Sequence, residues 1–581
     1  MKKQKIIFLL VSALISSCSS VSKNEIIPEN DDNILIMAKN LPFTNLSQDY
    51  NIEGNSISTY YINGDDVPYV DVLKYIQSLN GFVNCGKSLR HKYYPNKNMF
   101  VLSFYYNDNL NSYAQFHWDT NSIYVSDFDF FTDITSKNQK TNYNSYIKHT
   151  RYDSWSEKAV RFNLGLYYFD ILYWNEKCLM PFTIANMLFC SQNQFNVYYT
   201  EESYYGFYGE IDNGDDAYKT IYTNNSNGKT QSKEMRKATV NSLLFAMDYF
   251  YGLKKSKKIK LFKEYISKND FDLLWSQNAD DNFIGLKHII FNQLDELHTR
   301  IDGRSIYSNK HSDQLYNSSD YGEFRNKFYS LYNQQSALRK EKIGESSVSY
   351  VRYNNDTAII TFDSFKTGSK FELYDSDGNI KDTAWKYDTY FFMQHCMNDI
   401  IKHEEVHDIV LDLSLNGGGN IGAMNRTLGF LTDKVILDYS YNTLTNEYSC
   451  RHFKIDTDGD GYYDDDAYNQ YRWTILSSMN SFSATNSFIC KVKQQNLAKI
   501  IGNKSGGGMC SVLPLVLADG TAIAISSNNS NRYVVRKDDG DIYYSIENGI
   551  EPDMEIPYGD YYDNSKIAEY VDAVYSKDNN R

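Results

Sequence analysis

The sequence predicts a multidomain α/β protein with a strand-rich N-terminal part, a helical middle part and a C-terminal part in which strands and helices alternate. Three observations support this prediction. Short strand-like runs separated by turn residues fill 46–150, apolar residues recur every three or four positions over 233–298, and strand and helix patterns alternate from 346 onward. Such alternation is typical of a sheet whose functional loops follow the carboxyl ends of its strands.

The chain is long and acidic. Its 581 residues are enough for roughly three or four domains. The formal net charge is −14, which argues against nucleic acid as a partner because phosphates repel an acidic surface. The 52 tyrosines are spread over the whole chain, so they reflect its overall composition and do not mark a site.

The first residues have the pattern of an export signal. A basic start is followed by the apolar run Ile6–Ile15 and by Ile15-Ser16-Ser17-Cys18. This resembles a bacterial lipoprotein signal, which implies removal of residues 1–17, lipidation of Cys18, and a membrane-anchored protein of the cell envelope that faces the periplasm or the exterior. Residues 18–45 then form a polar tether. An ordinary secretory signal is the alternative.

The chain has eight cysteines, so seven remain after Cys18. An odd number leaves at least one thiol free in an exported protein. None of them has the C-x-x-C spacing of a zinc site. Cys178 and Cys190 are the only close pair, and they are the one candidate disulfide.

Residues 46–230 predict one or more β-rich accessory domains. The region from 56 to 130 weakly resembles copper-amine-oxidase N-terminal-like domains, which implies an accessory role and no metal. A polar stretch, T-N-N-S-N-G-K-T-Q-S-K, marks the end of this part.

Residues 231–345 predict a helical segment. Apolar spacing predicts helices over Lys233–Lys254, Lys260–Leu274 and Phe283–His298. Residues 299–345 are polar and poorly patterned, which predicts a loop or a small bridging element.

Residues 346–581 predict the α/β core. Strand patterns at 347–353, 356–363 and 407–413 alternate with helix patterns at 388–403 and 422–431. A further strand over Trp473–Leu476 precedes a helix over Ala484–Leu497, and Ser483 lies at the corner between them. The first N–H groups of a helix have no partner within the helix, so this corner suits either a helix-capping serine or a nucleophile.

Three motifs of the core together indicate a family. I-V-L-D-L-S-L-N-G-G-G-N, S-F-S-A-T-N and I-I-G-N-K-S-G-G-G-M resemble the tail-specific, or C-terminal processing, serine peptidases, with coverage of about 285–558. The resemblance implies a ClpP/crotonase-like α/β core, polypeptide substrates and no required cofactor. It makes Ser483 the nucleophile of an acyl-enzyme mechanism. The oxyanion donors would be the backbone N–H groups of Ala484 and of Gly418 or Gly419.

The base separates two branches of this family. One branch uses a lysine at the position that Gly508 occupies here. The other branch, which resembles the tricorn protease core, uses an upstream histidine and a late glutamate. L-D-E-L-H-T-R and S-I-E-N-G-I-E match those segments, so the resemblance implies Ser483, His298 and Glu547 as nucleophile, base and orienting group. Lys504 remains the alternative base, and a peptidase-like binding lipoprotein without turnover remains the alternative function.

A second motif, D-T-D-G-D-G-Y-Y-D-D-D, spans 456–466. It follows the first half of an EF-hand-like loop and predicts a structural calcium site. Position twelve of the loop is Ala467 instead of glutamate, so a solvated acidic hairpin is the alternative. The candidate ligands are Asp456, Asp458, Asp460, the carbonyl of Tyr462, and Asp464 or Asp465.

Overall fold

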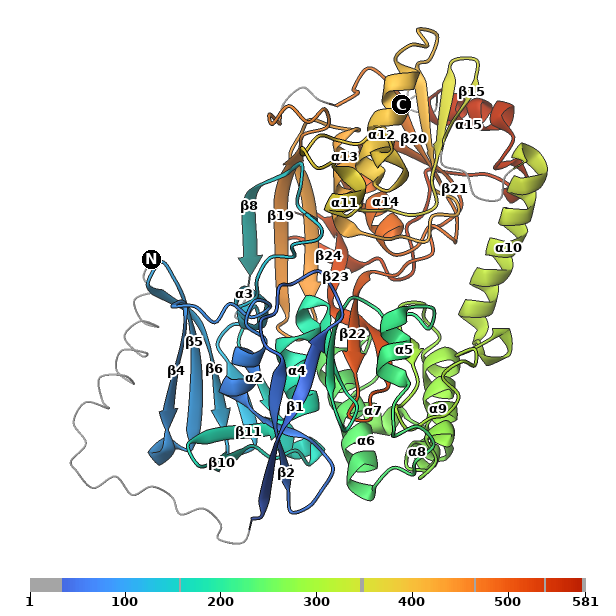
Figure 1. The fold of residues 1–581 in the computed structure, drawn as a ribbon. Coiled ribbons are helices and arrows are strands. Elements are labelled where there is room, and N and C mark those ends of the chain that lie inside the picture. Colours follow the sequence, from blue (N-terminus) through green and yellow to red (C-terminus); the bar gives the residue numbers. More distant parts are fainter. Residues whose placement is uncertain (1–33, 156–157, 345–349, 464–466, 538–539, 577–581) are drawn as a thin grey trace.

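In the computed structural model, the described residues form four β-sheets with helices packed around them (Figure 1). The predicted α/β multidomain class is confirmed. Within the described part of the chain, no helix combines the length and the apolar character that crossing a bilayer requires. The predicted signal and Cys18 lie within 1–33, outside the described residues. The tether predicted over 18–45 is too long, because its last ten residues form strand β1 (Ile36–Asn45), which pairs with two other strands of a sheet. The structure describes residues 34–155, 158–344, 350–463, 467–537 and 540–576.

Two sheets make up the N-terminal part. Their apolar side chains and those of the short helices between them contribute to one continuous core. The first sheet has the order β10 (Leu172–Trp174), β11 (Lys177–Pro181), β3 (Tyr69–Asp71), β2 (Ser56–Ile62), β1 (Ile36–Asn45), β13 (Tyr204–Tyr208) and β12 (Phe195–Tyr199). The second has the order β4 (Leu89–Tyr94), β5 (Met99–Tyr106), β6 (Asn109–His117), β7 (Ser122–Val125) and β9 (Val160–Asn163). The helices are α2 (Val72–Ser78), α3 (Phe130–Asp133), α4 (Phe182–Phe189) and α5 (Asp216–Tyr222).

The predicted Cys178–Cys190 disulfide is wrong. Cys178 lies on β11 and Cys190 follows α4, and both thiols are free and buried. The Cys190 thiol instead lies 3.3 Å from the hydroxyl of Tyr75 on α2. Closeness in sequence therefore does not pair these cysteines: the rest of strand β11 and the whole of helix α4 lie between them along the chain.

The middle part is helical as predicted, but all three predicted helices differ in extent. Helix α6 is Lys233–Phe250, whereas the second predicted helix is divided into α7 (Phe262–Tyr265) and α8 (Lys268–Leu274). The third is α9 (Ala279–Lys287), continued by a π-helix over His288–Leu294. It ends there because Asp295 adopts a left-handed conformation with φ = 41°.

The region 299–345 is more ordered than its pattern predicts. It begins with strand β14 (Arg300–Gly303) and ends with the 21-residue helix α10 (Glu323–Ile343). In Figure 1, α10 runs along one side of the molecule, from the helical middle part to the C-terminal core.

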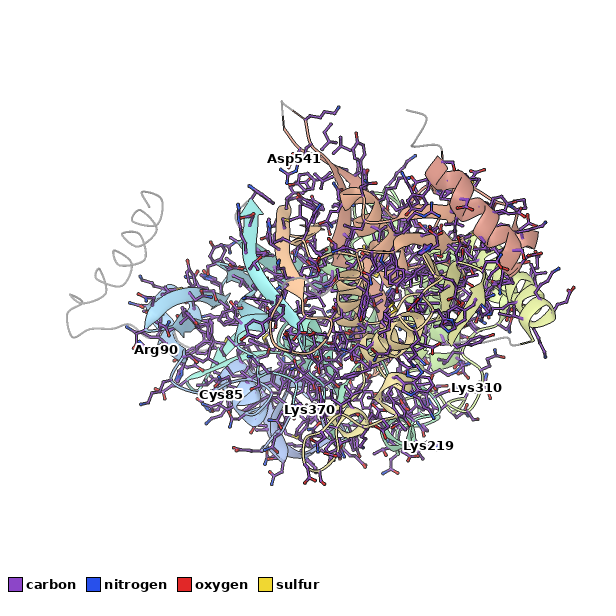
Figure 2. The ribbon with its side chains drawn as sticks, turned by 90° about the horizontal axis from the view of Figure 1, so that it is seen from above. Cys85, Arg90, Lys219, Lys310, Lys370 and Asp541 are labelled. Carbon is purple, nitrogen blue, oxygen red and sulfur yellow. The ribbon has the colours of Figure 1, made fainter. Side chains whose placement is uncertain are left out.

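A third sheet joins parts that the sequence assigns to different domains. Strand β8 (Ile147–Trp155) comes from the N-terminal part and β14 from the middle part, and both pair with strands of the C-terminal part. The order is β14, β23 (Ala522–Val535), β18 (Ile436–Asn442), β19 (Glu447–Ile455) and β8, and β22 (Cys510–Val516) and β24 (Ile542–Ser545) also pair with β23. Strands β23 and β24 extend as a hairpin that projects from the molecule, with Asp541 near its tip (Figure 2).

The fourth sheet carries the predicted core. Its order is β15 (Tyr350–Asn354), β16 (Thr357–Thr361), β17 (Asp408–Asp412), β20 (Arg472–Ser477), β21 (Lys499–Gly502) and β25 (Met554–Glu555), and the pairs from β16 to β25 are parallel.

Both faces of the fourth sheet are covered, as expected for parallel strands. Because side chains alternate along a strand, Val410 contacts one apolar cluster while its neighbours Ile409 and Leu411 belong to the other. The helices of this part are α11 (Lys370–Leu373), α12 (Thr389–Ile400), α13 (Ile421–Gly429), α14 (Ala484–Gln495) and α15 (Asn564–Ser576).

Candidate active site

Ser483 lies at the corner between strand β20 and helix α14. Its backbone has φ = 58° and ψ = −119°, a conformation that residues with a side chain rarely adopt. Hydrogen bonds hold the corner from both sides: the Ser483 N–H donates to the Gly507 carbonyl at 2.9 Å, and the Phe482 N–H donates to the Asn416 carbonyl at 3.2 Å. A serine on such a strained strand-to-helix turn presents its hydroxyl at the top of the sheet.

His298 reaches this corner from another sheet. It directly precedes Thr299 and strand β14, which pairs with β23 in antiparallel register. Its Nε2 lies 2.8 Å from the Ser483 Oγ, although 185 residues separate the two in sequence. The imidazole is 5% exposed, and its ring packs on Phe482 at 4.9 Å between centroids. The structure thus places a histidine and a serine in direct hydrogen-bonding contact.

The surroundings of His298 favour the neutral imidazole. Burial lowers its pKa to about 4, although the nearby Glu296 carboxylate acts in the opposite direction. A neutral ring that accepts the Ser483 proton at Nε2 must carry its own proton on Nδ1. That Nδ1 is buried and has no hydrogen-bond partner among the described residues. The base is therefore in the protonation state that proton abstraction needs, but one of its nitrogens has no partner.

Glu547 lies in the loop next to the serine corner but does not contact His298 through a hydrogen bond. Its carboxylate accepts the N–H of Met509 at 2.9 Å. Its backbone carbonyl lies against Gly507, whose own carbonyl binds the Ser483 N–H. Burial and the proximity of Glu296 raise the pKa of Glu547 to about 8. The structure therefore places Glu547 beside the corner without the contact expected of an orienting group.

A different carboxylate, Glu296, holds the backbone at His298. It accepts the N–H of His298 at 2.7 Å and the N–H of Thr299 at 3.1 Å, and it is 5% exposed. Glu296 is not among the residues that the sequence motifs single out. The signal that could have found it is an acid two positions before the histidine, since a carboxylate at that spacing can accept the following N–H groups.

The predicted oxyanion donors surround the serine. Gly418 comes so close that a β-carbon on it would lie 2.7 Å from the Ser483 Cβ. Its N–H, however, donates to the Asn416 side chain at 3.0 Å. The Gly419 N–H has no acceptor among the described residues, and the Ala484 N–H is the first of helix α14. The geometry favours Gly419 together with Ala484.

Lys504 is directed away from the corner. Its ammonium pairs with the Glu551 carboxylate at 2.7 Å, and both side chains are about half exposed. No hydrogen bond joins Lys504 to Ser483 among the described residues, where the Ser483 hydroxyl contacts His298. The alternative base therefore lacks the contact that the histidine makes.

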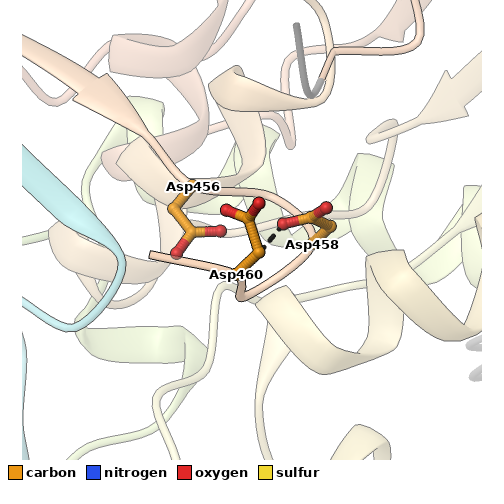
Figure 3. Close-up of side chains that lie close together, drawn as sticks. All are labelled: Asp456, Asp458 and Asp460. Atoms are coloured by element: carbon orange, nitrogen blue, oxygen red, sulfur yellow. Dashed lines mark hydrogen bonds between the residues drawn. The ribbon is translucent and has the colours of Figure 1, made fainter. Parts of the chain in front are cut away.

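The acidic loop brings three of its predicted ligands together. One carboxylate oxygen from each of Asp456, Asp458 and Asp460 lies within 4.8 Å of the others (Figure 3). Asp456 is buried and accepts the N–H groups of two loop glycines, while Asp458 and Asp460 are exposed. Tyr462 is present in the loop, whereas Asp464 and Asp465 lie outside the described residues. The calcium site stays a prediction.

A serine hydroxyl at a strained corner, a neutral buried histidine beside it and free backbone N–H groups are the features that the active site of a serine hydrolase uses. Residues 356–556 match the model of the peptidase family S41. The chain therefore carries a serine-type peptidase domain, and peptidases act on polypeptides. His298 lies outside the matched residues.

Comparison with solved structures gives only distant likenesses. A candidate peptidase from Parabacteroides merdae is 16% identical with a TM-score of 0.37, covering 56% of this chain and 90% of that one. A lipoprotein from Streptococcus agalactiae is 13% identical with a TM-score of 0.36, covering 59% and 98%. Mature CPAF complexed with lactacystin is 11% identical with a TM-score of 0.34, covering 59% and 98%. These values support no functional argument. No curated protein matches the chain.

Proposed function

We propose that this protein is a lipid-anchored serine endopeptidase in which Ser483 is the nucleophile and His298 the general base. The observation that supports the assignment most is the 2.8 Å contact between Nε2 and Oγ at a strained corner. Contact between a base and a hydroxyl is what a serine needs, because the hydroxyl is a weak nucleophile until a neighbour takes its proton.

The reaction follows from this geometry. As the Ser483 oxygen attacks the peptide carbonyl carbon, its proton passes to Nε2 of His298. The carbonyl oxygen becomes an oxyanion that accepts the N–H groups of Gly419 and Ala484. The carbon–nitrogen bond then breaks and Nε2 returns the proton to the leaving amine. A water molecule, deprotonated by the same nitrogen, hydrolyses the acyl-enzyme and releases Ser483.

The imidazolium formed in these steps needs a counter-charge. Glu547 is proposed for this role because it lies beside the corner, and it can act only in its ionised form. Its raised pKa means that ionisation requires a pH near 8 or above. Glu296, which accepts the N–H of His298, also acts to raise the pKa of the imidazole.

Labelling with a fluorophosphonate tests the nucleophile. The soluble part of the chain should form a covalent adduct on Ser483, identified by peptide mass spectrometry, and should digest denatured casein. Ser483→Ala should lose both, while Ser511→Ala, a change at a hydroxyl bonded to Ser527 on the neighbouring strand, should retain both. A folded protein that neither labels nor digests polypeptides would support the alternative of a peptidase-like binding protein.

The anchor and the location are part of the proposal. They rest on the sequence pattern that ends at Cys18. Cys18→Ala should move the protein from the membrane fraction to the soluble fraction and should abolish incorporation of labelled palmitate. Unchanged fractionation and labelling of that variant would contradict a lipid anchor.

The acidic loop is proposed as a structural calcium site. Calcium should raise the melting temperature, because an ion that binds only the folded state stabilises it by mass action. Asp458→Ala, which removes an exposed member of the cluster, should abolish that rise. Equal melting curves in calcium and in chelator would instead support the solvated hairpin.

A further inference from the structure

Helix α10 contacts both halves of the candidate active site: the segment around His298, which is the histidine half, and the segment around Ser483, which is the serine half. It occupies a region in which sequence periodicity predicts no helix, and most of its surface is exposed. Its buried residues are Arg325, Phe328, Gln335 and Arg339. The first two lie one turn apart on the same face of the helix, and they contact different parts of the site.

The histidine half is bound to the first turn of α10. The Asp295 carboxylate accepts the N–H groups of Phe324 at 2.7 Å and of Arg325 at 3.1 Å, which caps the helix start. The Arg325 side chain makes contacts in the opposite direction, from the helix to the segment around His298. Its guanidinium donates to the backbone carbonyl of Glu296 and, at 2.6 Å, to that of Thr299. Because these two carbonyls flank His298, Arg325 fixes the backbone on both sides of the base.

The serine half is bound by the next turn. The Phe328 ring packs edge-on against Phe482, the residue before the nucleophile, at 5.7 Å between centroids. The carbonyl of Phe328 accepts the side-chain N–H of Asn480 at 3.0 Å. Phe482 in turn packs on the ring of His298. One turn of α10 thus joins the segment that carries the base to the segment that carries the nucleophile.

A second buried arginine lies near the other end of the same helix and anchors that end. Arg339 forms two hydrogen bonds with the Asp363 carboxylate, at 2.8 and 2.6 Å. Fourteen residues of helix separate it from Arg325, which corresponds to about 21 Å. Both guanidinium groups are at most 2% exposed. The two arginines are therefore alike in burial although they lie at opposite ends of the helix, and among the described residues it is Arg325 that binds the segment carrying His298.

We propose that Arg325 is a positioning residue that couples helix α10 to the catalytic base and keeps the His298 imidazole against the Ser483 hydroxyl. This inference rests on the proposed function of those two residues. The guanidinium suits the task because both bonds come from one nitrogen, Nη2, whose two N–H groups are fixed in the guanidinium plane and reach both carbonyls. Without it, the backbone from Glu296 to Thr299 loses two of its anchors, and the ring can move away from the hydroxyl.

The test compares Arg325→Gln with Arg339→Gln in the full soluble chain, by casein digestion and by the rate of reaction with a fluorophosphonate. For Arg325→Gln we expect kcat to fall roughly 100-fold, as for a displacement of about 1 Å in a catalytic group, with KM little changed. The rate of fluorophosphonate reaction should fall in parallel. Arg325→Lys should restore part of the loss, and Arg339→Gln should keep kcat within about threefold of the wild type while lowering the melting temperature comparably.

Several outcomes would overturn the inference. Equal losses of kcat in the two glutamine variants, in proportion to their melting temperatures, would make α10 a merely stabilising helix. If Arg325→Gln does not fold, Phe328→Leu provides the second test, because it trims the contact with Phe482 and leaves Arg325 in place; an unchanged kcat would contradict the coupling. The proposed function fails separately, if Ser483→Ala remains active. If Ser483→Ala is inactive and Arg325→Gln is fully active, the proposed function stands and only the role of Arg325 is refuted.

Discussion

The proposed nucleophile and the proposed base are held by parts of the molecule that are built in different ways. Ser483 follows a strand in the middle of a parallel sheet, and both faces of that sheet are buried. His298 precedes the four-residue strand β14 at the edge of an antiparallel sheet. The serine is therefore positioned mainly by the peptidase core, with one turn of α10 packed beside it, whereas the histidine depends on the pairing of β14 with β23 and on α10. Displacing the base does not require the core to unfold.

The largest expected effect tests whether the two halves act as one unit. Ser483→Ala and His298→Ala should each lower kcat by roughly 10⁴-fold or more, because members of such a unit fail together. The double variant should be hardly worse than either single variant. Casein digestion with matched melting curves provides the measurement. A His298→Ala variant with substantial activity would separate the histidine from the chemistry.

The serine half should be sensitive to a single methyl group. A β-carbon at Gly418 would lie 2.7 Å from the Ser483 Cβ, and φ at this glycine is 112°, so Gly418→Ala displaces the corner and its oxyanion donors. We expect kcat to fall roughly 10²- to 10³-fold, as when an oxyanion donor is lost.

Gly417→Ala is the matched control for that variant. A β-carbon at Gly417 meets nothing within 4 Å, so its kcat should stay close to that of the wild type. Equal activity of the two variants would show that the close contact between the Gly418 backbone and Ser483 does not require glycine.

The same contrast explains which parts could be predicted from the sequence. The strands and helices of the core carry local apolar patterns, and the corner before α14 follows from a strand run next to a helix run. Helix α10 could not be found in this way, because Arg325 and Arg339 are buried where periodicity treats arginine as a surface residue. Its exposed residues include Tyr329 and Tyr332 as well as polar ones, so no apolar stripe stands out in its sequence.

The histidine half shows the same limit. The predicted helix through His298 ends earlier, because Asp295 turns left-handed and caps the distant helix α10 instead of continuing its own. Glu296 gains its role from the fold of the backbone around His298. Contacts of this kind join residues that are far apart in sequence or need a specific backbone turn, so the spacing of residue types does not reveal them.

A smaller effect, which depends on pH, concerns Glu547. The pKa of His298 is lowered to about 4, so kcat/KM should rise with pH near 4, as the imidazole becomes neutral. The pKa of Glu547 is raised to about 8, so ionisation of this carboxylate should give a second rise near pH 8. Glu547→Gln should cost less than about tenfold at pH 7 and should lose the second rise, because glutamine imitates the neutral acid.

The stability of the protein checks this pKa independently. Folding raises the pKa of Glu547 above its usual value, so the folded state binds this proton more tightly than the unfolded state does. The stabilisation that the bound proton provides is complete below the usual pKa and is lost as pH rises through about 8. The wild type should therefore lose melting temperature more steeply than Glu547→Gln between about pH 4.5 and pH 8, where the folded state holds a proton that the unfolded state has lost. Parallel melting curves for the two proteins across this range would contradict a raised pKa.

The smallest effect is expected at Lys504, and it separates the two branches of the family. The serine–lysine branch requires an amine against the nucleophile, but the Lys504 ammonium pairs with Glu551 at a half-exposed position. Such a pair contributes at most about 1 kcal/mol, because water screens the charges and ordering two long side chains costs entropy. Lys504→Ala should therefore keep kcat and KM within about twofold of the wild type across the pH range, as expected for a surface substitution outside the site. Loss of fluorophosphonate labelling in a folded Lys504→Ala, with His298→Ala still labelled, would instead assign the base to the lysine and remove the histidine half from the mechanism.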